Sequence, residues 1–293
     1  MKIVPYFATM ALVALTMISC SKKADAQSSN INNTENMTEQ STDTASVKIA
    51  VKTSAGDITL LLYGDTPKHR DNFVRLVEES YYDSVLFHRV IKNFMIQTGD
   101  PESKTALAGT PLGAGGPGYT IDAEIVFPRH FHKRGALAAA RQGDAVNPQK
   151  RSSGSQFYIV TGNKLTDGDV DNLAMHLLNN RKQSIFNRLA GERRQTIIDM
   201  QSRGDRAGLQ ALQEELIKLT EAEVEAEGKV TISEEMRQAY TTVGGAPHLD
   251  GEYTVFGEVI EGMDVVEAIE NAATDKLDRP KEDIRIISMK VVK

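Results

Sequence analysis

The chain has 293 residues, of which 40% are hydrophobic and 25% are charged. Such values are those of an ordinary soluble protein with one large or two small domains. The formal net charge is −6, and lysine and arginine form no dense cluster. This argues against nucleic acid as a partner, because phosphate binding requires a basic surface. Cys20 is the single cysteine, so the mature domain has no internal disulfide and no CxxC redox or zinc site.

Residues 1–19 have the features of an export signal. A positively charged start precedes an apolar stretch at residues 7–18, which is too short to span a bilayer comfortably. A small residue before Cys20 resembles a bacterial lipobox, and this resemblance implies cleavage before Cys20 and a lipid on its sulfur. The alternative is an ordinary secretory signal with an incidental cysteine. Residues 20–45 are polar and predict a disordered tether.

The folded part of the chain is expected to begin near residue 46 with a β-hairpin. Val47–Val51 and Ile58–Leu62 alternate in polarity, and Ser54–Asp57 between them has the residues of a turn. Pro67 then opens a helical pattern, in the first-turn position that proline tolerates. Further strands are expected at Val85–Val90, Phe94–Thr98, Gly135–Ala140, Gln156–Thr161, Tyr253–Ile260 and Ile284–Val292, with a short helix at Met263–Ala272.

A glycine-rich loop, GTPLGAGGPG, occupies residues 109–118. Phosphate binding is a weak interpretation, because the loop lacks GxxxxGK[ST] and does not have GxGxxG spacing between a strand and a helix. The simpler interpretation is a loop whose glycines permit positive φ angles and a close approach of the backbone.

Residues 167–240 differ in character from the rest of the domain. They are highly charged and low in glycine, and leucines such as Leu209, Leu212, Leu216 and Leu219 follow the spacing of an amphipathic helix. Gly204-Asp205 indicates a break between helices, and Ser233 is placed to cap a third one. Outside this helical insert, many short strands with two short helices predict a closed or nearly closed antiparallel barrel.

The run FHRVIKNFMIQTGD, residues 87–100, carries the clearest chemical signal. It places Arg89 among apolar residues, with Phe94, Met95 and Gln97 close behind. A permanent cation beside an apolar surface and a neutral amide suits an uncharged, apolar ligand that needs one polarising contact. Such a site requires no cofactor and no metal. His130 and His132 form a weak metal pair, since two ligands without a third predict little.

The same run resembles the signature of the cyclophilin-type peptidyl-prolyl isomerases. Four further segments resemble that family and occur in its order. They are the glycine-rich loop, GALAAAR (135–141), SSGSQFYIVTG (152–162) and HLDGEYTVFGEV (248–259). The resemblance implies a mainly β domain over residues 46–293, built as a closed antiparallel eight-stranded barrel with two flanking helices. The insert at 167–240 interrupts this domain and is not part of the common fold.

The resemblance also implies a role for each matching residue. Arg89 is the expected catalytic arginine, and Gln97 is expected to orient it. The expected substrate-binding residues are Phe94, Met95, Ala140, Arg141, Gln156, Tyr158, His248, Leu249 and Tyr253. Three of these depart from the family pattern: Arg141, His248 and Tyr253 stand where asparagine, tryptophan and histidine are frequent. These departures put tight binding of cyclosporin-type inhibitors in doubt but leave the catalytic pair intact.

These observations together predict a monomeric prolyl isomerase that assists the folding of exported proteins. Its expected partners are proline-containing polypeptides, together with a membrane reached through the lipid on Cys20. The expected location is the cell envelope, on the periplasmic side in a Gram-negative bacterium. An alternative is a binding module for proline-containing segments, in which the helical insert contacts a protein partner. A third interpretation places the insert across the pocket, where it regulates access.

Overall fold

The structure is a computed structural model that describes residues 45–228 and 231–292. The predicted signal peptide at residues 1–19, the predicted lipidation site Cys20 and the predicted tether up to residue 44 therefore lie outside the described residues. Among the residues that the structure describes, no helix is long and apolar enough to cross a membrane.

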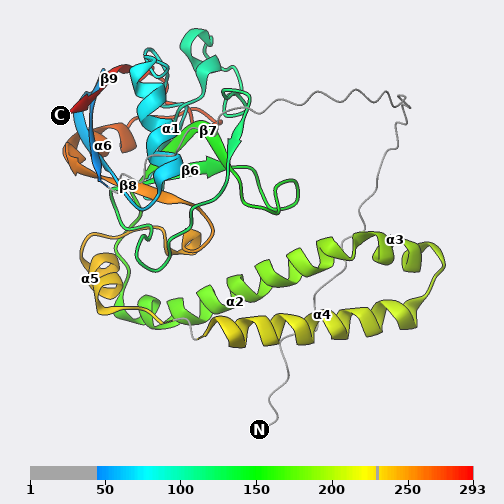
Figure 1. The fold of residues 1–293 in the computed structure, drawn as a ribbon. Helices are drawn as coiled ribbons and strands as arrows, with labels where there is room; N and C mark the ends of the chain where they lie inside the picture. Colours follow the sequence, from blue (N-terminus) through cyan, green and yellow to red (C-terminus); the bar gives the residue numbers. More distant parts are fainter. Residues whose placement is uncertain (1–44, 229–230, 293) are drawn as a thin grey trace, which may run out of the picture. The chain divides into compact units, whose positions relative to one another are not determined.

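One curled antiparallel sheet of nine strands forms the body of the domain (Figure 1). The strand order is β3-β4-β7-β6-β8-β2-β1-β9, and β5 pairs with β7 beside this path. The strands are β1 (Val47–Thr53), β2 (Gly56–Leu62), β3 (Arg89–Ile91), β4 (Met95–Thr98), β5 (Thr120–Ile121), β6 (Ala136–Arg141), β7 (Ser152–Val160), β8 (Val255–Glu261) and β9 (Ile286–Val292).

The prediction of a closed, eight-stranded barrel is wrong, because the sheet has nine strands and its two end strands, β3 and β9, form no ladder with each other. The segments that precede β3 and β9 in the sequence are hydrogen-bonded to each other instead. Phe87 N–H donates to Ile284 O and Ile286 N–H donates to Val85 O, each at 2.9 Å. Strand β3 then turns away, since its Val90 N–H donates to the loop carbonyl of Asp278 rather than to β9. The sheet therefore remains an open half-barrel.

The main core lies between one face of the sheet and two helices, α1 (Pro67–Glu78) and α6 (Met263–Glu270). In β1 and β2 every second residue is buried, which is the period-2 pattern of a strand with one face in a core. Phe73 of α1 packs against Phe157 and Phe256, with ring centroids 5.1 and 5.7 Å away. Two 3₁₀ turns, η1 (Pro101–Thr105) and η2 (Pro247–Leu249), complete the body.

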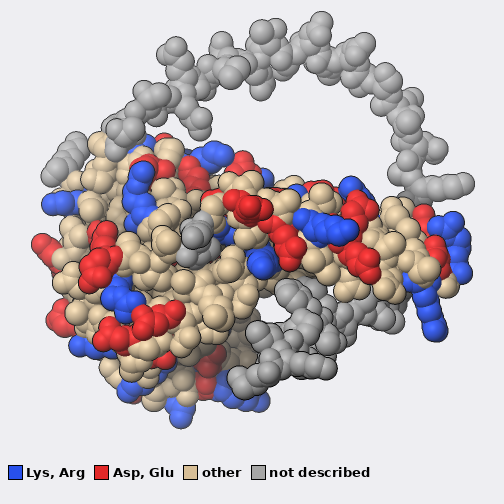
Figure 2. Space-filling view, turned by 90° about the horizontal axis from the view of Figure 1, so that it is seen from below, with Lys and Arg blue, Asp and Glu red and all other residues tan. Residues whose placement is uncertain are grey.

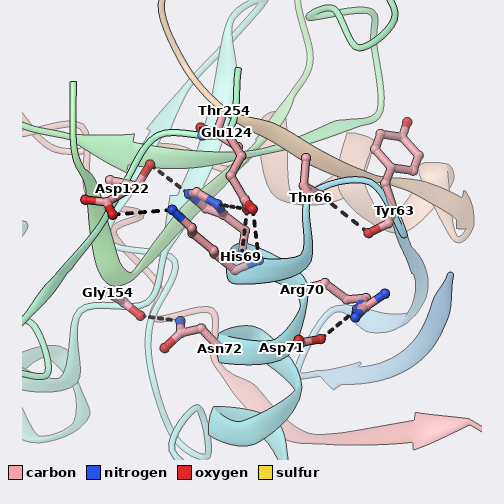
Figure 3. A network of polar contacts seen from close by, with 12 residues as sticks. Tyr63, Thr66, His69, Arg70, Asp71, Asn72, Asp122, Glu124, Gly154 and Thr254 are labelled. Carbon is pink, nitrogen blue, oxygen red and sulfur yellow. Dashed lines mark hydrogen bonds and ion pairs between the residues drawn. The ribbon is translucent and has the colours of Figure 1, made fainter. Parts of the chain in front are cut away.

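A partly buried carboxylate holds the beginning of α1 (Figure 3). Glu124 accepts hydrogen bonds from the backbone N–H groups of Lys68 and His69, each at 3.0 Å, and its Oε2 lies 2.7 Å from His69 Nδ1. Because a carboxylate only accepts, Nδ1 carries the hydrogen of this bond, and Nε2 on the other side of the ring is hydrogen-bonded to the Ser152 hydroxyl, 2.9 Å away. The order Ser–His–Glu is that of some hydrolases, but Ser152 is 1% exposed, so the set fastens α1 to β7.

Replacing Glu124 with glutamine is expected to destabilise the domain above pH 5 by about 1–3 kcal/mol, the cost of leaving buried donors poorly paired. Burial raises the pKa of Glu124, but the hydrogen bonds from His69 and Lys68 outweigh it and hold this pKa below its usual value. The stabilisation is therefore complete above the unfolded pKa of about 4.3 and is lost as pH falls through the folded pKa. Urea unfolding from pH 7 to pH 3 measures this. An equal loss of stability on acidification in both proteins would contradict the assignment.

The insert forms four helices: α2 (Asp167–Glu192), α3 (Arg194–Ser202), α4 (Arg206–Glu227) and α5 (Glu234–Thr242). The predicted break is confirmed, since α3 ends at Ser202 and Asp205 caps α4. The predicted cap at Ser233 is also confirmed. Helices α2 and α4 run side by side (Figure 1), and Arg188 of α2 pairs with Glu223 of α4 at 2.5 Å.

The apolar stripe of α4 is only partly as predicted. Leu212 and Leu216 are buried, but Leu219 is 40% exposed, because the stripe covers one neighbouring helix rather than a full core. A separate apolar cluster joins the root of the insert to the sheet domain, with Phe131 packed against Val170 and Leu173 of α2 and Tyr240 of α5. On the face seen in Figure 2, basic and acidic side chains are interspersed, so no single-sign field develops there.

Candidate active site

Strand register brings the predicted catalytic pair and the pocket floor into one row. Arg89 of β3 is directly opposite Gln97 of β4, and Gln97 is directly opposite Tyr158 of β7. Directly paired residues project from the same face of a sheet, so all three side chains lie on one face. Met95, two residues before Gln97, shares that face because side chains alternate along a strand. This face is opposite to the one that carries the main core.

A cavity of about 160 Å³ opens on this row. Its volume is suited to a small ring, and its walls combine apolar and aromatic groups with two arginines and one amide. The residues that line it are Arg89, Phe94, Met95, Gln97, Ala140, Arg141, Tyr158, Leu249 and Tyr253. Nine of the predicted site residues therefore meet in one cavity. Among the described residues, none of the insert lines it, so the structure gives no support to the interpretation that the insert lies across the pocket.

Arg89 is held loosely enough to meet a ligand. Its Nη1 donates to Gln97 Oε1 at 3.3 Å, and its Nε lies 4.0 Å from a carboxylate oxygen of Asp278. The side chain is 43% exposed. A guanidinium has five N–H donors, so donors remain for a bound peptide. Asp278 is a neighbour that sequence reasoning missed, because it comes from a loop near the end of the chain.

Gln156 and the glycine-rich loop lie behind Gln97. Gln97 Nε2 donates to Gln156 Oε1 at 3.0 Å, and Gln156 Nε2 donates to the carbonyls of Gly113 and Gly115 at 3.0 and 2.7 Å. Gln156 is buried and is not among the residues that line the cavity. The structure thus places it where it supports Gln97, while its predicted contact with a peptide stays a prediction.

The loop interpretation of residues 109–118 is confirmed. Gly113 has a φ angle of 98°, and a Cβ on Gly115 would lie 2.2 Å from Asp100 Oδ1. The Asp100 carboxylate accepts the N–H groups of Gly113 and Gly115 at 2.6 and 3.3 Å. Since an anion of the protein itself occupies these amides, they do not offer a phosphate site.

Arg141 and Tyr253 form a second wall of the cavity. The Arg141 guanidinium lies over the Tyr253 ring, 4.5 Å from its centroid, and donates to the Glu252 carbonyl at 2.9 Å and to Asp144 at 2.6 Å. Its side chain is 5% exposed. The donors of Arg141 are therefore largely committed inside the protein, unlike those of Arg89, and its predicted contact with peptide backbone stays a prediction.

His248 lies beside the cavity rather than in its lining. Its ring packs on Phe94, with centroids 5.3 Å apart at 33°. Burial lowers the pKa of His248 below its ordinary value, so near neutral pH the ring is an uncharged extension of the aromatic surface. His248 thus retains an aromatic side chain next to Phe94 where the family often has tryptophan.

The other histidines near the site have structural surroundings. His88 is buried, neither of its ring nitrogens has a hydrogen-bond partner among the described residues, and burial lowers its pKa to about 4. His88 therefore packs as a neutral ring. His130 faces Asp65 and His132 faces Asp250, so these two histidines point to different carboxylates. Within residues 45–228 and 231–292, no group of three His, Cys, Asp or Glu side chains could hold a metal ion.

The fold and the cavity together define a β-sheet protein with a small site in which apolar and aromatic side chains lie beside the Arg89–Gln97 pair. Comparison with known proteins gives the family: residues 47–224 and 228–291 match the family described as cyclophilin type peptidyl-prolyl cis-trans isomerase/CLD. The match covers well over half of the chain, so the chain belongs to the cyclophilin-type peptidyl-prolyl cis-trans isomerases.

Two curated relatives agree with this membership. A protein of Staphylococcus saprophyticus assigned as a peptidyl-prolyl cis-trans isomerase is 31% identical over 249 residues, which cover 84% of this chain and 92% of that protein. A protein of Streptococcus pyogenes assigned as a bifunctional phosphatase/peptidyl-prolyl cis-trans isomerase is 31% identical over 249 residues, and this chain spans 38% of its length. A crystal structure of a Cryptosporidium parvum cyclophilin type peptidyl-prolyl cis-trans isomerase matches with a TM-score of 0.49 at 22% identity, covering 85% of this chain and 99% of that one.

Proposed function

We propose that this protein accelerates rotation about X–Pro bonds in exported polypeptides while they fold. The observation that carries the proposal is the pair Arg89–Gln97 beside apolar and aromatic side chains, in a cavity that is large enough for a proline ring. Membership of the isomerase family supports the reaction. A proline side chain would occupy the apolar part of the cavity, between Met95 and Leu249.

The residue types fit the chemistry of this rotation. The barrier of about 18–20 kcal/mol arises from amide resonance, so no bond breaks and no nucleophile or metal is required. As the bond twists, the lone pair of the prolyl nitrogen is released from resonance and can accept a hydrogen bond. An N–H of Arg89 would donate that bond, and the hydrogen bond to Gln97 at 3.3 Å would help to orient the guanidinium. The bond strengthens as the peptide twists, so it stabilises the transition state more than the ground state.

The surroundings of the pair favour this electrostatic effect. Tyr158 closes the floor of the cavity, and burial raises its pKa well above the ordinary value, so it remains a neutral phenol. A peptide bound over the cavity would displace water from the Arg89 guanidinium, which is 43% exposed without it, and the lower local dielectric would strengthen its attraction for the nitrogen lone pair.

Exchange spectroscopy by NMR on a short Ala-Pro peptide tests the reaction. The soluble part of the chain, residues 46–293, should increase the rate of cis–trans exchange at substoichiometric concentration. A folded protein that leaves the exchange rate unchanged would show that the cavity only binds, and would favour the alternative of a binding module.

We further propose that the protein is held at a membrane of the cell envelope by a lipid on Cys20, with the isomerase domain on the periplasmic side. The export signal and the lipobox-like residues before Cys20 support this location. In a Gram-negative host, radiolabelled palmitate should be incorporated into the full chain and not into Cys20→Ser. An unlabelled, soluble periplasmic product from the unaltered chain would instead indicate an ordinary secretory signal.

A further inference from the structure

A continuous chain of hydrogen bonds runs from the helical insert to the floor of the pocket. Tyr240 of α5 donates its hydroxyl to Asp250 Oδ2 at 2.5 Å. Asp250 Oδ1 lies 2.9 Å from His132 Nδ1 and accepts the His132 backbone N–H at 2.8 Å. His132 Nε2 lies 3.0 Å from the Tyr158 hydroxyl. These four residues come from four separate segments of the chain, and the insert supplies the first of them.

The direction of each bond follows from what the groups can donate. A carboxylate only accepts, so Asp250 takes hydrogens from Tyr240 and from His132, and His132 Nδ1 is the protonated ring nitrogen. The other ring nitrogen, Nε2, is hydrogen-bonded to the Tyr158 hydroxyl, which can both donate and accept. Every member is polarised by the one before it, which strengthens the bonds cooperatively.

Because all four residues are buried, each hydrogen bond between them is costly to lose. The exposed fractions are 0% for Tyr240, 3% for Asp250, 1% for His132 and 5% for Tyr158. Water therefore cannot replace a missing partner without entering the core, and an unpaired carboxylate oxygen at Asp250 would be costly. Loss of one bond is expected to shift the groups that remain.

Tyr158, the last residue of this series of hydrogen bonds, contacts groups that would hold a peptide. The Tyr158 ring lies nearly parallel to His132, at 12°, and meets Tyr253 edge-on at 84° with centroids 6.0 Å apart. Both tyrosines line the cavity. The hydrogen bond to His132 therefore fixes the plane of the Tyr158 ring, which contacts Tyr253. Through Tyr253 it also fixes the position of the Arg141 guanidinium, which lies over the Tyr253 ring.

We propose that Tyr240 is a positioning residue for the pocket, and that the insert sets the floor of the proline site through Asp250 and His132. This inference rests on the proposed function for its effect on turnover, although the hydrogen-bond chain can be tested without it. Tyr240 touches no substrate, because it is not among the residues that line the cavity. Its hydroxyl acts on Tyr158 of the pocket through two intermediate groups, Asp250 and His132.

The conservative variant Tyr240→Phe removes the hydroxyl and keeps the ring that packs with Phe131. Its dissociation constant for an Ala-Pro peptide is expected to rise about three- to tenfold, as for one hydrogen bond, with a matching fall in kcat/KM. Thr220→Val is the matched control, because it removes a buried hydroxyl of the insert that bonds only locally, to Leu216 O at 2.8 Å. This control should bind the peptide as the unaltered protein does.

A double-mutant cycle separates positioning from general stability. Tyr158→Phe alone should weaken peptide binding by a similar factor, and the double variant should be no weaker than the weaker single variant, because the second change acts on a chain already broken. If the two substitutions acted independently, their effects on the dissociation constant would instead multiply. Equal peptide affinity in Tyr240→Phe and Thr220→Val, or fully multiplicative losses in the cycle, would overturn the proposal.

The imidazole of His132 gives a readout that needs no turnover. Its ring ¹⁵N shifts in the full chain should show hydrogen on Nδ1, and Tyr240→Phe should shift both ring nitrogens and the Tyr158 ring protons, whereas Thr220→Val should not. Unchanged shifts in Tyr240→Phe would refute the coupling even in an active enzyme. Shifted signals in a protein without isomerase activity would instead sustain the coupling and reject the proposed function.

Discussion

Replacing Arg89 with alanine is expected to lower kcat/KM for X–Pro rotation by about 10²–10³-fold, the usual loss when one preorganised donor to the transition state is removed. The apolar floor remains, so the dissociation constant for the peptide should change far less than the rate. Exchange NMR on the Ala-Pro peptide, with a parallel binding titration, measures both quantities. Arg89→Lys should recover only part of the rate, because an ammonium lacks the planar set of donors.

The fold of this variant should be unaffected. Arg89 is 43% exposed, and its contacts with Asp278 at 4.0 Å and Gln97 at 3.3 Å are weak. An exposed ion pair of this kind contributes about 0–1 kcal/mol. Arg75→Ala is a matched control, since Arg75 on α1 is 48% exposed and pairs with Glu79, the residue that follows the helix. Full activity in Arg89→Ala would contradict the electrostatic mechanism. Equal losses of kcat/KM in Arg89→Ala and Arg75→Ala would indicate a general effect of the lost charge.

The parts of the molecule that follow a local rule could be predicted from the sequence. Alternating polarity in Val47–Val51 and Ile58–Leu62 marked the first hairpin, and the cap residues Asp205 and Ser233 marked helix starts. Resemblance to a family located the cavity, because the matching motifs supply nine of its lining residues. These signals depend on neighbours in sequence or on whole motifs, and both survive without knowledge of the tertiary structure.

Features that depend on contacts between distant segments could not be predicted. The sheet stays open because Val90 bonds to the loop at Asp278, and nothing near Val90 in the sequence indicates this. The commitment of Arg141 to Asp144 and Glu252 distinguishes it from Arg89, although both arginines stand in apolar runs. His132 looked like half of a metal pair, and its actual partner, Asp250, is more than a hundred residues away.

The contact between the insert and the pocket was hidden for the same reason. A buried tyrosine near the end of an amphipathic helix looks like a packing residue, and the Tyr240 ring does pack against Phe131. The hydroxyl acquires its role only because Asp250, next to Leu249 of the cavity lining, folds back against α5. The insert therefore has two separable parts. The root, which consists of Val170, Leu173 and α5, joins the sheet domain near the pocket. The hairpin, which is formed by the rest of α2 with α3 and α4, extends from this root.

Shortening the hairpin and removing the whole insert are expected to give different results. Arg188 and Glu223 are in contact across α2 and α4, so residues 189–222 can be replaced by a short glycine linker. This leaves Val170, Leu173 and α5 in place. The shortened protein should bind and isomerise the Ala-Pro peptide as the full chain does, because neither the cavity nor the hydrogen-bond chain to Tyr158 loses a group.

Replacement of all of residues 167–240 should weaken the pocket and the fold together. The main core contains no residue of the insert, so the sheet should still form. However, Phe131 becomes exposed and Asp250 loses the hydroxyl of Tyr240, a combined cost of about 2–4 kcal/mol. Peptide affinity should fall at least as far as in Tyr240→Phe, which urea unfolding and peptide titration would show together.

These two deletions also decide between an isomerase and a binding module. If the insert holds a protein partner through its outer helices, the shortened protein should lose capture of an unfolded, proline-rich client while it retains full turnover of the short peptide. If the insert serves the pocket alone, client and short peptide should be affected alike, and only by the complete deletion. A complete deletion that binds and turns over the peptide normally would show that the root of the insert does not position the pocket.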